Sequence, residues 1–338
     1  MASIAVDVMS GDRGAPECVP GALRALAADP ELELILVGNP EIIQAELARA
    51  SPDMRARAAV HAAASVVAMS EHPRDAIRRR KDSSMRLAID LVKEGRAAAM
   101  VSAGNTGALT AMSHFVLKTV GPVERAPIMS SVPARDGGHT HMLDLGANSK
   151  ATALQLAQFA TMGSIVARDV FGLANPRIGL LNIGEEETKG NELTREAHRL
   201  LKHAPVRFIG NIEGRDVFAG HADVVVCDGF TGNITLKLSE GLVDTVEGLL
   251  HDELASTFGG RVGYALSRQA FRRFRLRVDH SDYGGAPLVG VNGLCIVAHG
   301  RSSAKAIANA VTMASRAVDA DLVARLRRDV KALENPLQ

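Results

Sequence analysis

Residues 223–241, DVVVCDGFTGNITLKLSEG, contain the pattern that decides the fold class. The continuous β-branched run at 223–227 predicts a short strand that is buried on both faces. A glycine-bearing turn follows at 228–233, and the apolar side chains from residue 234 onward have helical spacing. A strand that passes through a tight turn into a helix gathers backbone N–H groups at one point, where an anion can bind. This stretch therefore predicts an α/β fold with an anion-binding turn.

Two other stretches repeat this arrangement of strand, glycine turn and helix. The strand predicted at 97–101 precedes SAGNTGA at 102–108, and the strand predicted at 178–183 precedes GEEETKGNE at 184–192. Open α/β sheets bind their ligands at the carboxyl edge of the strands. We therefore expect all three turns on one parallel sheet, around a phosphate-handling pocket.

The rest of the chain continues the alternation of strands and helices. Further strands are expected at 3–8, 32–37, 140–145, 206–209 and 294–298. Helices are expected at 20–28, from 40 onward, at 85–94, 108–118, 151–170 and 192–202, and from 303 onward. This order predicts a three-layer α/β/α fold with a mostly parallel sheet. With 338 residues, 46% of them hydrophobic, we expect a single two-lobed catalytic domain over 1–338 rather than two close-packed domains.

Composition narrows the class of function. A net charge of +1, 3% aromatic residues and no Trp do not suggest nucleic acid as a partner. The three cysteines lie far apart without metal-ligand spacing, which is consistent with a reducing compartment. The amino-terminal residues do not resemble a secretion signal, and no apolar run reaches about 18 residues. We expect a cytoplasmic protein.

Several common catalytic motifs do not occur in the sequence. It has no G-x-x-x-x-G-K-[ST] loop, no G-x-G-x-x-G fingerprint, no G-x-S-x-G elbow and no H-E-x-x-H pair. We interpret His139 and His141 as solvent-facing rather than metal-binding, and Cys227 as a packed thiol rather than a nucleophile. We expect neither a cofactor nor a metal. Because the sequence offers no credible covalent nucleophile, an active site would have to position two substrates and stabilise charge.

Lys189 and Asn233 are candidate site residues, and each has a structural alternative. Lys189 could equally be a surface lysine paired with a carboxylate at 185–187. Asn233 could be the amino-terminal cap of its helix, and pattern alone favours the cap. Other turn residues could bind phosphate or substrate, or could simply form turns and caps. They are Asp7, Gly11, Asp12, Ser102, Gly104, Asn105, Thr106, Asn148 and Gly232.

Residues 245–278 predict an amphipathic helical hairpin, with a break at Gly259 and Gly260. Between 254 and 278 there are six arginines and no acidic residue. The hairpin could form a dimer interface, or its tip could contact anionic lipid or an acidic protein, and these interpretations are compatible. The expected contacts with a carrier protein or membrane are Arg261, Arg268, Arg272, Arg273, Leu254 and Phe258, with Arg275 and Arg277 in the same run.

Short blocks along nearly the whole chain resemble the bacterial phosphate acyltransferase family, the acyl-acyl-carrier-protein:phosphate transacylases of phospholipid synthesis. They are IAVD at 4–7, RRKDSS at 79–84, VSAGNTGA at 101–108, LDLGAN at 143–148, NIGEE at 182–186 with KGNE at 189–192, GNIEG at 210–214, DGFTGN at 228–233 and YGGAPL at 283–288. Two departures occur. Ser10 stands where the family usually has a second glycine, and 149–151 read SKA instead of Val-Asp-Cys.

The resemblance implies transfer of a fatty acyl group from acyl carrier protein to inorganic phosphate, which gives acyl phosphate for phospholipid synthesis. It also implies a homodimer with a fold similar to phosphotransacetylases and isocitrate dehydrogenase-like proteins. Peripheral attachment to an anionic membrane is implied as well, where a glycerol-phosphate acyltransferase takes the product. Lys189 and Asn233 match the positions that the family uses in catalysis or phosphate contact.

The expected mechanism is direct attack of phosphate on the thioester carbonyl. Turn amides and Lys189 would hold the phosphate, and Asn233 would stabilise the developing oxyanion. Thioester and acyl phosphate are both activated acyl groups, so no ATP is required. The alternatives are a short-chain acyl-coenzyme A phosphotransacetylase, a metal- and nucleotide-dependent dehydrogenase of the same fold group, and a non-catalytic acyl-carrier- or lipid-binding scaffold.

Overall fold

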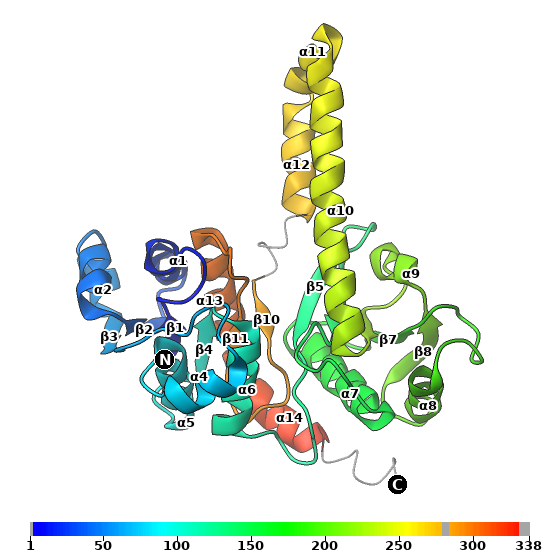
Figure 1. Cartoon of the computed structure of the whole chain (residues 1–338), viewed down its shortest axis with the longest axis horizontal. Helices are drawn as coiled ribbons and strands as arrows, with labels where there is room; N and C mark the ends of the chain where they lie inside the picture. Colours follow the sequence, from blue (N-terminus) through cyan, green and yellow to red (C-terminus); the bar gives the residue numbers. More distant parts are fainter. Residues whose placement is uncertain (1–2, 279–283, 331–338) are drawn as a thin grey trace.

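The computed structural model describes residues 3–278 and 284–330, with the side chains of 275–278 excepted. Its strands form two sheets, which lie in the left and right halves of Figure 1. The six-stranded sheet contains, in spatial order, β10 (Ala286–Pro287), β11 (Leu294–Val297), β4 (Ala99–Ser102), β1 (Ser3–Asp7), β2 (Glu33–Gly38) and β3 (Ala58–Ala62). The five-stranded sheet contains β5 (Met129–Pro133), β6 (His139–Leu143), β9 (Val224–Val226), β7 (Arg177–Leu181) and β8 (Arg207–Ile212).

Both sheets are mostly parallel, which confirms the α/β class. Among the strand pairs of the described residues, β10–β11 and β5–β6 are antiparallel and the others are parallel. The two antiparallel edge strands face each other between the sheets. One isolated bridge, between Ile128 and Leu288, joins the sheets there.

The prediction that the three glycine turns share one sheet is wrong. The turn after β4 belongs to the six-stranded sheet, whereas the turns after β7 and β9 belong to the five-stranded sheet. The second sheet begins in the chain with β5, which pairs antiparallel with β6 and forms the edge of that sheet. Ser130 and Ser131 interrupt the apolar pattern of β5, so the sequence offered no clear strand signal there.

Helices cover both faces of the sheets. Their bounds are α1 Ala15–Ala28, α2 Pro40–Leu47, α3 Pro52–Ala56, α4 Pro73–Arg79, α5 Ser84–Lys93, α6 Thr106–Leu117, α7 Ala153–Asp169, α8 Glu192–Leu201, α9 Gly214–Ala219, α10 Gly229–Ser256, α11 Phe258–Leu266, α12 Arg268–Val278, α13 Ala304–Asp319 and α14 Leu322–Val330. Val224 and Val226 pack in the core cluster that contains α1, α7 and α13, and Val225 packs in the cluster that contains α5 and α6. All three valines are fully buried, so the predicted strand with two buried faces is confirmed.

The helices α10, α11 and α12 form a hairpin that projects from the rest of the molecule (Figure 1). The helix expected from residue 234 is the base of α10, which is 28 residues long. The predicted break at Gly259 and Gly260 is wrong, because both lie inside α11. The helix ends at Thr257 instead. The Thr257 side chain accepts the N–H of Gly260 at 3.0 Å and caps α11. Across 3–278 and 284–330, no helix is long and apolar enough to cross a membrane.

Candidate active site

The carboxyl edge of the six-stranded sheet contains two polar residues that are bonded to each other. Asp7 ends β1, Ser102 ends β4, and the two are direct neighbours in the register of these parallel strands. The Ser102 hydroxyl donates to Asp7 Oδ2 at 2.7 Å and accepts the N–H of Gly104 at 3.1 Å. Both side chains are buried. Through these hydrogen bonds the two side chains hold the turn after β4 in its shape.

The turns that follow β1, β4 and β11 contact one another closely. Gly11 has a φ of +94°, and a Cβ there would lie 3.2 Å from the Cβ of Ala103. The N–H of Asp12 donates to the carbonyl of Gly300 at 2.8 Å, so the turns after β1 and β11 are joined. Ser10, the departure from the usual two glycines, is buried beside Gly104, and within the described residues its hydroxyl has no hydrogen-bonding partner.

Asn105 has the capping role that was one of its two interpretations. Its Oδ1 accepts the N–H of Ala108 at 3.0 Å and caps α6. Its Nδ2 donates to the carbonyls of Met69 and Glu71, at 2.8 and 2.9 Å, and so fixes the segment before α4. Thr106, the first residue of α6, is exposed. Of these two residues, Thr106 is the one open to a ligand.

At the edge of the five-stranded sheet, Asn148 is held by a buried carboxylate. Its Nδ2 donates to Asp144 Oδ2 and to the carbonyl of Ala126, both at 2.9 Å. Asp144 is fully buried and accepts three more hydrogen bonds, from the backbone N–H groups of 128, 147 and 148. Burial raises the pKa of Asp144, and these hydrogen bonds oppose the rise. Sequence analysis missed Asp144, although an acidic residue at the end of an apolar strand signals a buried, bonded carboxyl group.

The start of α10 packs directly on the backbone of residue 144. A Cβ on Gly232 would lie 1.9 Å from the carbonyl oxygen of Asp144, so only glycine fits there. The cap of α10 is Asp228, whose Oδ1 accepts the N–H groups of Phe230 and Thr231 at 3.0 and 2.9 Å. The capping interpretation of Asn233 is therefore wrong.

Asn233 lies in the second turn of α10 and is exposed. Its side chain lies beside Gly146, since a Cβ on that glycine would be 3.4 Å from the Asn233 Cγ. In the part of the chain that the structure describes, the Asn233 amide makes no hydrogen bond. The amide is thus available to a reactant at the carboxyl edge of β6 and β9.

Lys189 lies in the loop that follows β7, next to β9 in the same sheet. The structure contradicts the alternative that Lys189 is a surface lysine paired with a neighbouring carboxylate. Glu187 bonds Lys202, and Glu185 lies 3.8 Å from Arg215. Within the described ranges, no carboxylate lies within 4.0 Å of the Lys189 ammonium group. Its aliphatic stem packs over Gly184, where a Cβ would lie 2.9 Å from the Lys189 Cγ.

One contact connects the two sheet edges. Lys237, one turn beyond Asn233 on α10, places its Nζ 3.4 Å from Nε2 of His299. His299 follows β11 and precedes Gly300, whose carbonyl accepts the N–H of Asp12. The two groups of predicted residues therefore lie on separate sheets, and α10 contacts the turn after β11 at this point. Sequence analysis did not identify Lys237 or His299.

The remaining titratable candidates are structural. His139 is exposed as expected, but the solvent-facing prediction is wrong for His141, which is buried and stacks on Phe171 at 4.0 Å. Burial lowers the pKa of His141 to about 4. Cys227 is buried, and burial together with Asp228 and Asp144 raises the pKa of its thiol, which confirms a packed thiol. Among the residues described, no three His, Cys, Asp or Glu side chains are grouped as metal ligands would be.

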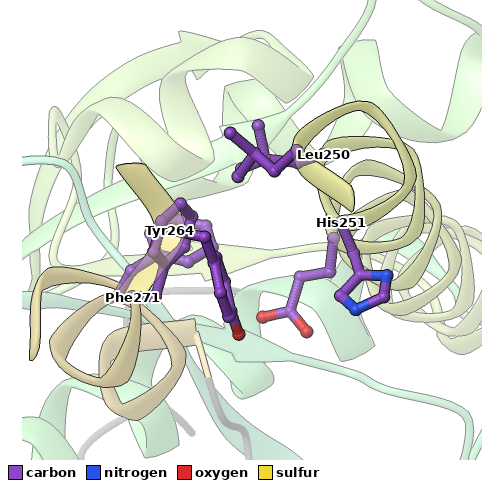
Figure 2. Close-up of a pocket in the computed structure, with 7 residues that line it drawn as sticks. Leu250, His251, Tyr264 and Phe271 are labelled. Carbon is purple, nitrogen blue, oxygen red and sulfur yellow. The ribbon is translucent and has the colours of Figure 1, made fainter. Parts of the chain in front are cut away.

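The pocket drawn in Figure 2 lies within the hairpin, between α10, α11 and α12. It is lined by Glu247, Leu250, His251, Leu254, Tyr264, Phe271 and Phe274. His251 lies roughly 27 Å along α10 from Asn233 at 1.5 Å per residue. This pocket is therefore not the place where Lys189 and Asn233 could act.

The predicted contact residues of the hairpin differ in exposure. Leu254 is half-buried against the pocket, whereas Phe258 is 83% exposed at the start of α11. Arg261, Arg268, Arg272 and Arg273 are exposed. The side chains of Arg275 and Arg277, and Tyr283 of the block at 283–288, lie outside the described residues.

Known proteins are similar to this chain over nearly its full length. The family described as "Fatty acid synthesis protein" matches residues 2–325. The phosphate acyltransferase of Heliobacterium modesticaldum is 47% identical over 334 residues, which is 99% of either chain. That of Alkalilimnicola ehrlichii is 45% identical over 338 residues, covering 99% of this chain and 98% of the relative.

Solved structures show the fold at much lower identity. A phosphotransacetylase from Streptococcus pyogenes superimposes with a TM-score of 0.62 at 17% identity, over 95% of this chain and 94% of that one. The EutD phosphotransacetylase from Staphylococcus aureus has a TM-score of 0.60 at 15% identity, over 94% of each chain. The fold expected from the sequence is thereby confirmed. On the sequence relatives, the chain belongs to the phosphate acyltransferase family of acyl-transferring enzymes.

Proposed function

We propose that the protein transfers a fatty acyl group from acyl carrier protein to inorganic phosphate and releases acyl phosphate for phospholipid synthesis. The observation that supports this best is the placement of Lys189 and Asn233 after the carboxyl ends of two neighbouring strands. Lys189 lies in the loop after β7 and Asn233 in the second turn of α10 after β9, two neighbouring parallel strands, and neither has a side-chain partner among the described residues. A cation and an amide donor that are not engaged elsewhere fit an anionic nucleophile and a developing oxyanion.

In the proposed reaction, a phosphate oxygen attacks the thioester carbonyl carbon. Lys189 holds the phosphate, and the amide of Asn233 donates to the carbonyl oxygen as its charge develops. The tetrahedral intermediate collapses, the carbon–sulfur bond breaks, and the carrier's sulfur leaves as thiolate and takes a proton from water. A good oxyanion donor of this kind contributes roughly 3–4 kcal/mol. The protein is never acylated, in keeping with the buried thiol of Cys227.

We assign to the hairpin the contacts with a second copy of the chain and with the membrane or carrier protein. Ile234, Leu238 and Leu242 are exposed apolar side chains on α10. A second copy of the chain would cover them in a homodimer. At the tip, exposed Phe258 and neighbouring arginines suit an anionic membrane or an acidic carrier protein. The enzyme would thus act in the cytoplasm, peripherally attached to the membrane, and pass its product to a membrane glycerol-phosphate acyltransferase.

The whole chain is proposed to act as one two-lobed catalytic domain. Ile4 of the six-stranded sheet and Val224 of the five-stranded sheet belong to the same core cluster. A continuous core of this kind favours one cooperative unit, with the two sheets as its lobes. A single thermal transition, coincident in circular dichroism and calorimetry, checks this.

A short-chain phosphotransacetylase is the less favoured function. The phosphotransacetylases are similar at 15–17% identity, which shows the fold alone, whereas the phosphate acyltransferases are similar at 45–47%. A non-catalytic carrier- or lipid-binding scaffold would bind acyl carrier protein without releasing thiol.

The decisive experiment incubates the purified protein with acylated carrier protein, with and without inorganic phosphate, and measures free carrier thiol. Phosphate-dependent thiol release is expected, with a long-chain acyl carrier preferred to acetyl-coenzyme A. Carrier binding without thiol release would contradict the proposed reaction. A preference for acetyl-coenzyme A would support the short-chain alternative.

A further inference from the structure

The loop that contains Lys189 is bonded by two polar residues that have not been assigned a role. Asn211 lies on β8, the edge strand beside β7, and His198 lies on α8 (Figure 1). Both side chains are buried. A buried amide or imidazole costs free energy unless it is hydrogen-bonded, so the partners of these two groups indicate what they stabilise.

The two side chains form a series of hydrogen bonds that ends on the backbone of the loop. Asn211 Nδ2 donates to the carbonyl of Glu186 at 3.0 Å. The same carbonyl accepts the N–H of Lys189, also at 3.0 Å. Because a carbonyl can only accept, the Asn211 amide places its nitrogen there and its oxygen towards His198. A single carbonyl group therefore connects Asn211 with the backbone of Lys189.

His198 fixes the orientation of the Asn211 amide. Its Nδ1 lies 2.9 Å from Asn211 Oδ1, and since that oxygen can only accept, Nδ1 is the donor. The imidazole also packs edge-to-face with Phe208, with ring centroids 5.1 Å apart. Its Nε2 makes no hydrogen bond within the described residues and lies 3.6 Å from the Glu187 carboxylate. The printed hydrogen bond of His198 thus reaches the loop through Asn211.

The backbone is bonded on the other side of Lys189 as well. Asn182 Nδ2 donates to the Lys189 carbonyl at 3.2 Å. Gly190 has a φ of +87°, and a Cβ there would lie 2.3 Å from Asn182 Oδ1. Lys189 is therefore bonded at its N–H and at its carbonyl, whereas its side chain is exposed. The backbone is fixed, and the ammonium group is left for a reactant.

We infer that Asn211 and His198 are positioning residues of the acyl-transfer reaction, an inference that rests on the proposed function. They hold the Lys189 loop so that the ammonium group meets the bound phosphate. Because lysine has a flexible four-carbon stem, its ammonium group is placed precisely only if its backbone is fixed. Misplacement of a reacting group by about 1 Å can cost roughly 10²-fold in rate.

The hold on the loop is tested first without activity, by amide hydrogen exchange on the full chain. Asn211→Asp keeps the size of the side chain and an acceptor for His198, but it places an oxygen against the Glu186 carbonyl. Asn211→Ala removes both bonds. Both variants are expected to exchange faster than the unmodified protein in the peptide 184–191, as read by mass spectrometry. Unchanged exchange there in both variants would overturn the inference.

Thr140→Val is the matched control. Thr140 is buried on β6 of the same sheet, and its hydroxyl donates to the carbonyl of Ala222 at 3.3 Å. Valine keeps the shape of the side chain and removes that bond. The control is expected to lower the Tm, as the Asn211 variants do, and to leave exchange at 184–191 and both KM values unchanged.

Steady-state kinetics then test the role in the reaction. Asn211→Asp and Asn211→Ala are each expected to lower kcat/KM for phosphate by roughly 10- to 10²-fold, with the KM for the acylated carrier within about twofold of that of the unmodified protein. His198→Leu, one bond further from the loop, is expected to cost less. His198→Asn, whose amide can place an N–H near the position of Nδ1, is expected to recover part of that loss.

A double-mutant cycle shows whether Asn211 acts through Lys189. In the Lys189→Met background, Asn211→Ala is expected to have little further effect on kcat/KM, because the group that it positions is gone. An equal fall in both backgrounds would make Asn211 a general support of the sheet and would overturn the inference.

Failure of the proposed function gives a different result. If the unmodified protein releases no thiol with phosphate, the proposed function fails, and the positioning role fails with it even if the exchange data show that Asn211 holds the loop. If the unmodified protein is active, Lys189→Met is not, and the Asn211 variants keep kcat/KM within about twofold, the inference alone is overturned.

Discussion

The two sheet edges contain similar types of residue in different states. At the six-stranded sheet, Asp7 and Ser102 bond each other, and Asn105 is occupied by its cap and by two backbone carbonyls. At the five-stranded sheet, Lys189 and Asn233 have no side-chain partner in the described part of the chain. Satisfied polar groups shape a turn, whereas unsatisfied exposed ones are available to a reactant. Four substitutions test this contrast.

The largest effect is expected from Lys189→Met. Because the ammonium group has no counter-ion to lose among the described residues, its removal acts on bound reactants alone. We expect kcat/KM for phosphate-dependent thiol release to fall about 10³-fold with the Tm unchanged. The control Lys202→Met removes a lysine that does have an ion-pair partner. Turnover of Lys189→Met near that of the unmodified protein would remove the residue from the mechanism.

Asn233→Ala is expected to have the next largest effect. The side chain is exposed and is not the helix cap, so the fold should tolerate its removal. Loss of one oxyanion donor is expected to lower kcat about 10²-fold with little change in the free energy of unfolding. Asp228→Ala, which removes the true cap, should instead destabilise the protein by about 1 kcal/mol. The contrast fails if the two variants show the reverse pattern.

Gly232→Ala tests the close approach that places Asn233. An added Cβ would lie 1.9 Å from the carbonyl of Asp144, so the base of α10 must move. We expect destabilisation by about 2–3 kcal/mol in urea unfolding and a roughly tenfold loss of kcat. Gly248→Ala on the same helix is the control. Nothing lies within 4 Å of its Cβ position, and it should be neutral or stabilise by up to about 1 kcal/mol.

The smallest catalytic effect is expected from Ser102→Ala at the bonded edge. It removes the hydrogen bond to buried Asp7 and the acceptor for the N–H of Gly104. A cost of about 1–3 kcal/mol in stability is expected, with kcat per folded molecule within a few-fold of the unmodified protein. A loss of kcat as large as that of Asn233→Ala, without loss of stability, would show that the six-stranded edge also takes part in the chemistry.

Much of the fold could be predicted because it depends on side-chain patterns within a few consecutive residues. The β-branched run at 224–226 needs apolar contacts on two faces, and the structure buries it on both. The capping interpretation of Asn105 also held, since a cap depends on the three residues that follow it. Patterns of this length report which face of an element is buried.

The candidate site was predicted in part. Lys189 and Asn233 were identified from their turns and from the family resemblance, but the cap assigned to Asn233 belongs to Asp228. Lys237 and His299 gave no signal, because a lysine on a helix and a histidine before a glycine are common surface residues. Their proximity depends on two segments about 60 residues apart.

By itself, the amino-acid sequence determined most of the helices, the buried strand at 224–226 and the glycine turns, because each depends on side chains within a few residues of one another. Only the tertiary structure decided that the turns divide between two sheets, that α10 packs on the carbonyl of Asp144, and that Lys237 meets His299. These are contacts between distant segments. Their energy depends on the fit of whole surfaces, which no local pattern contains.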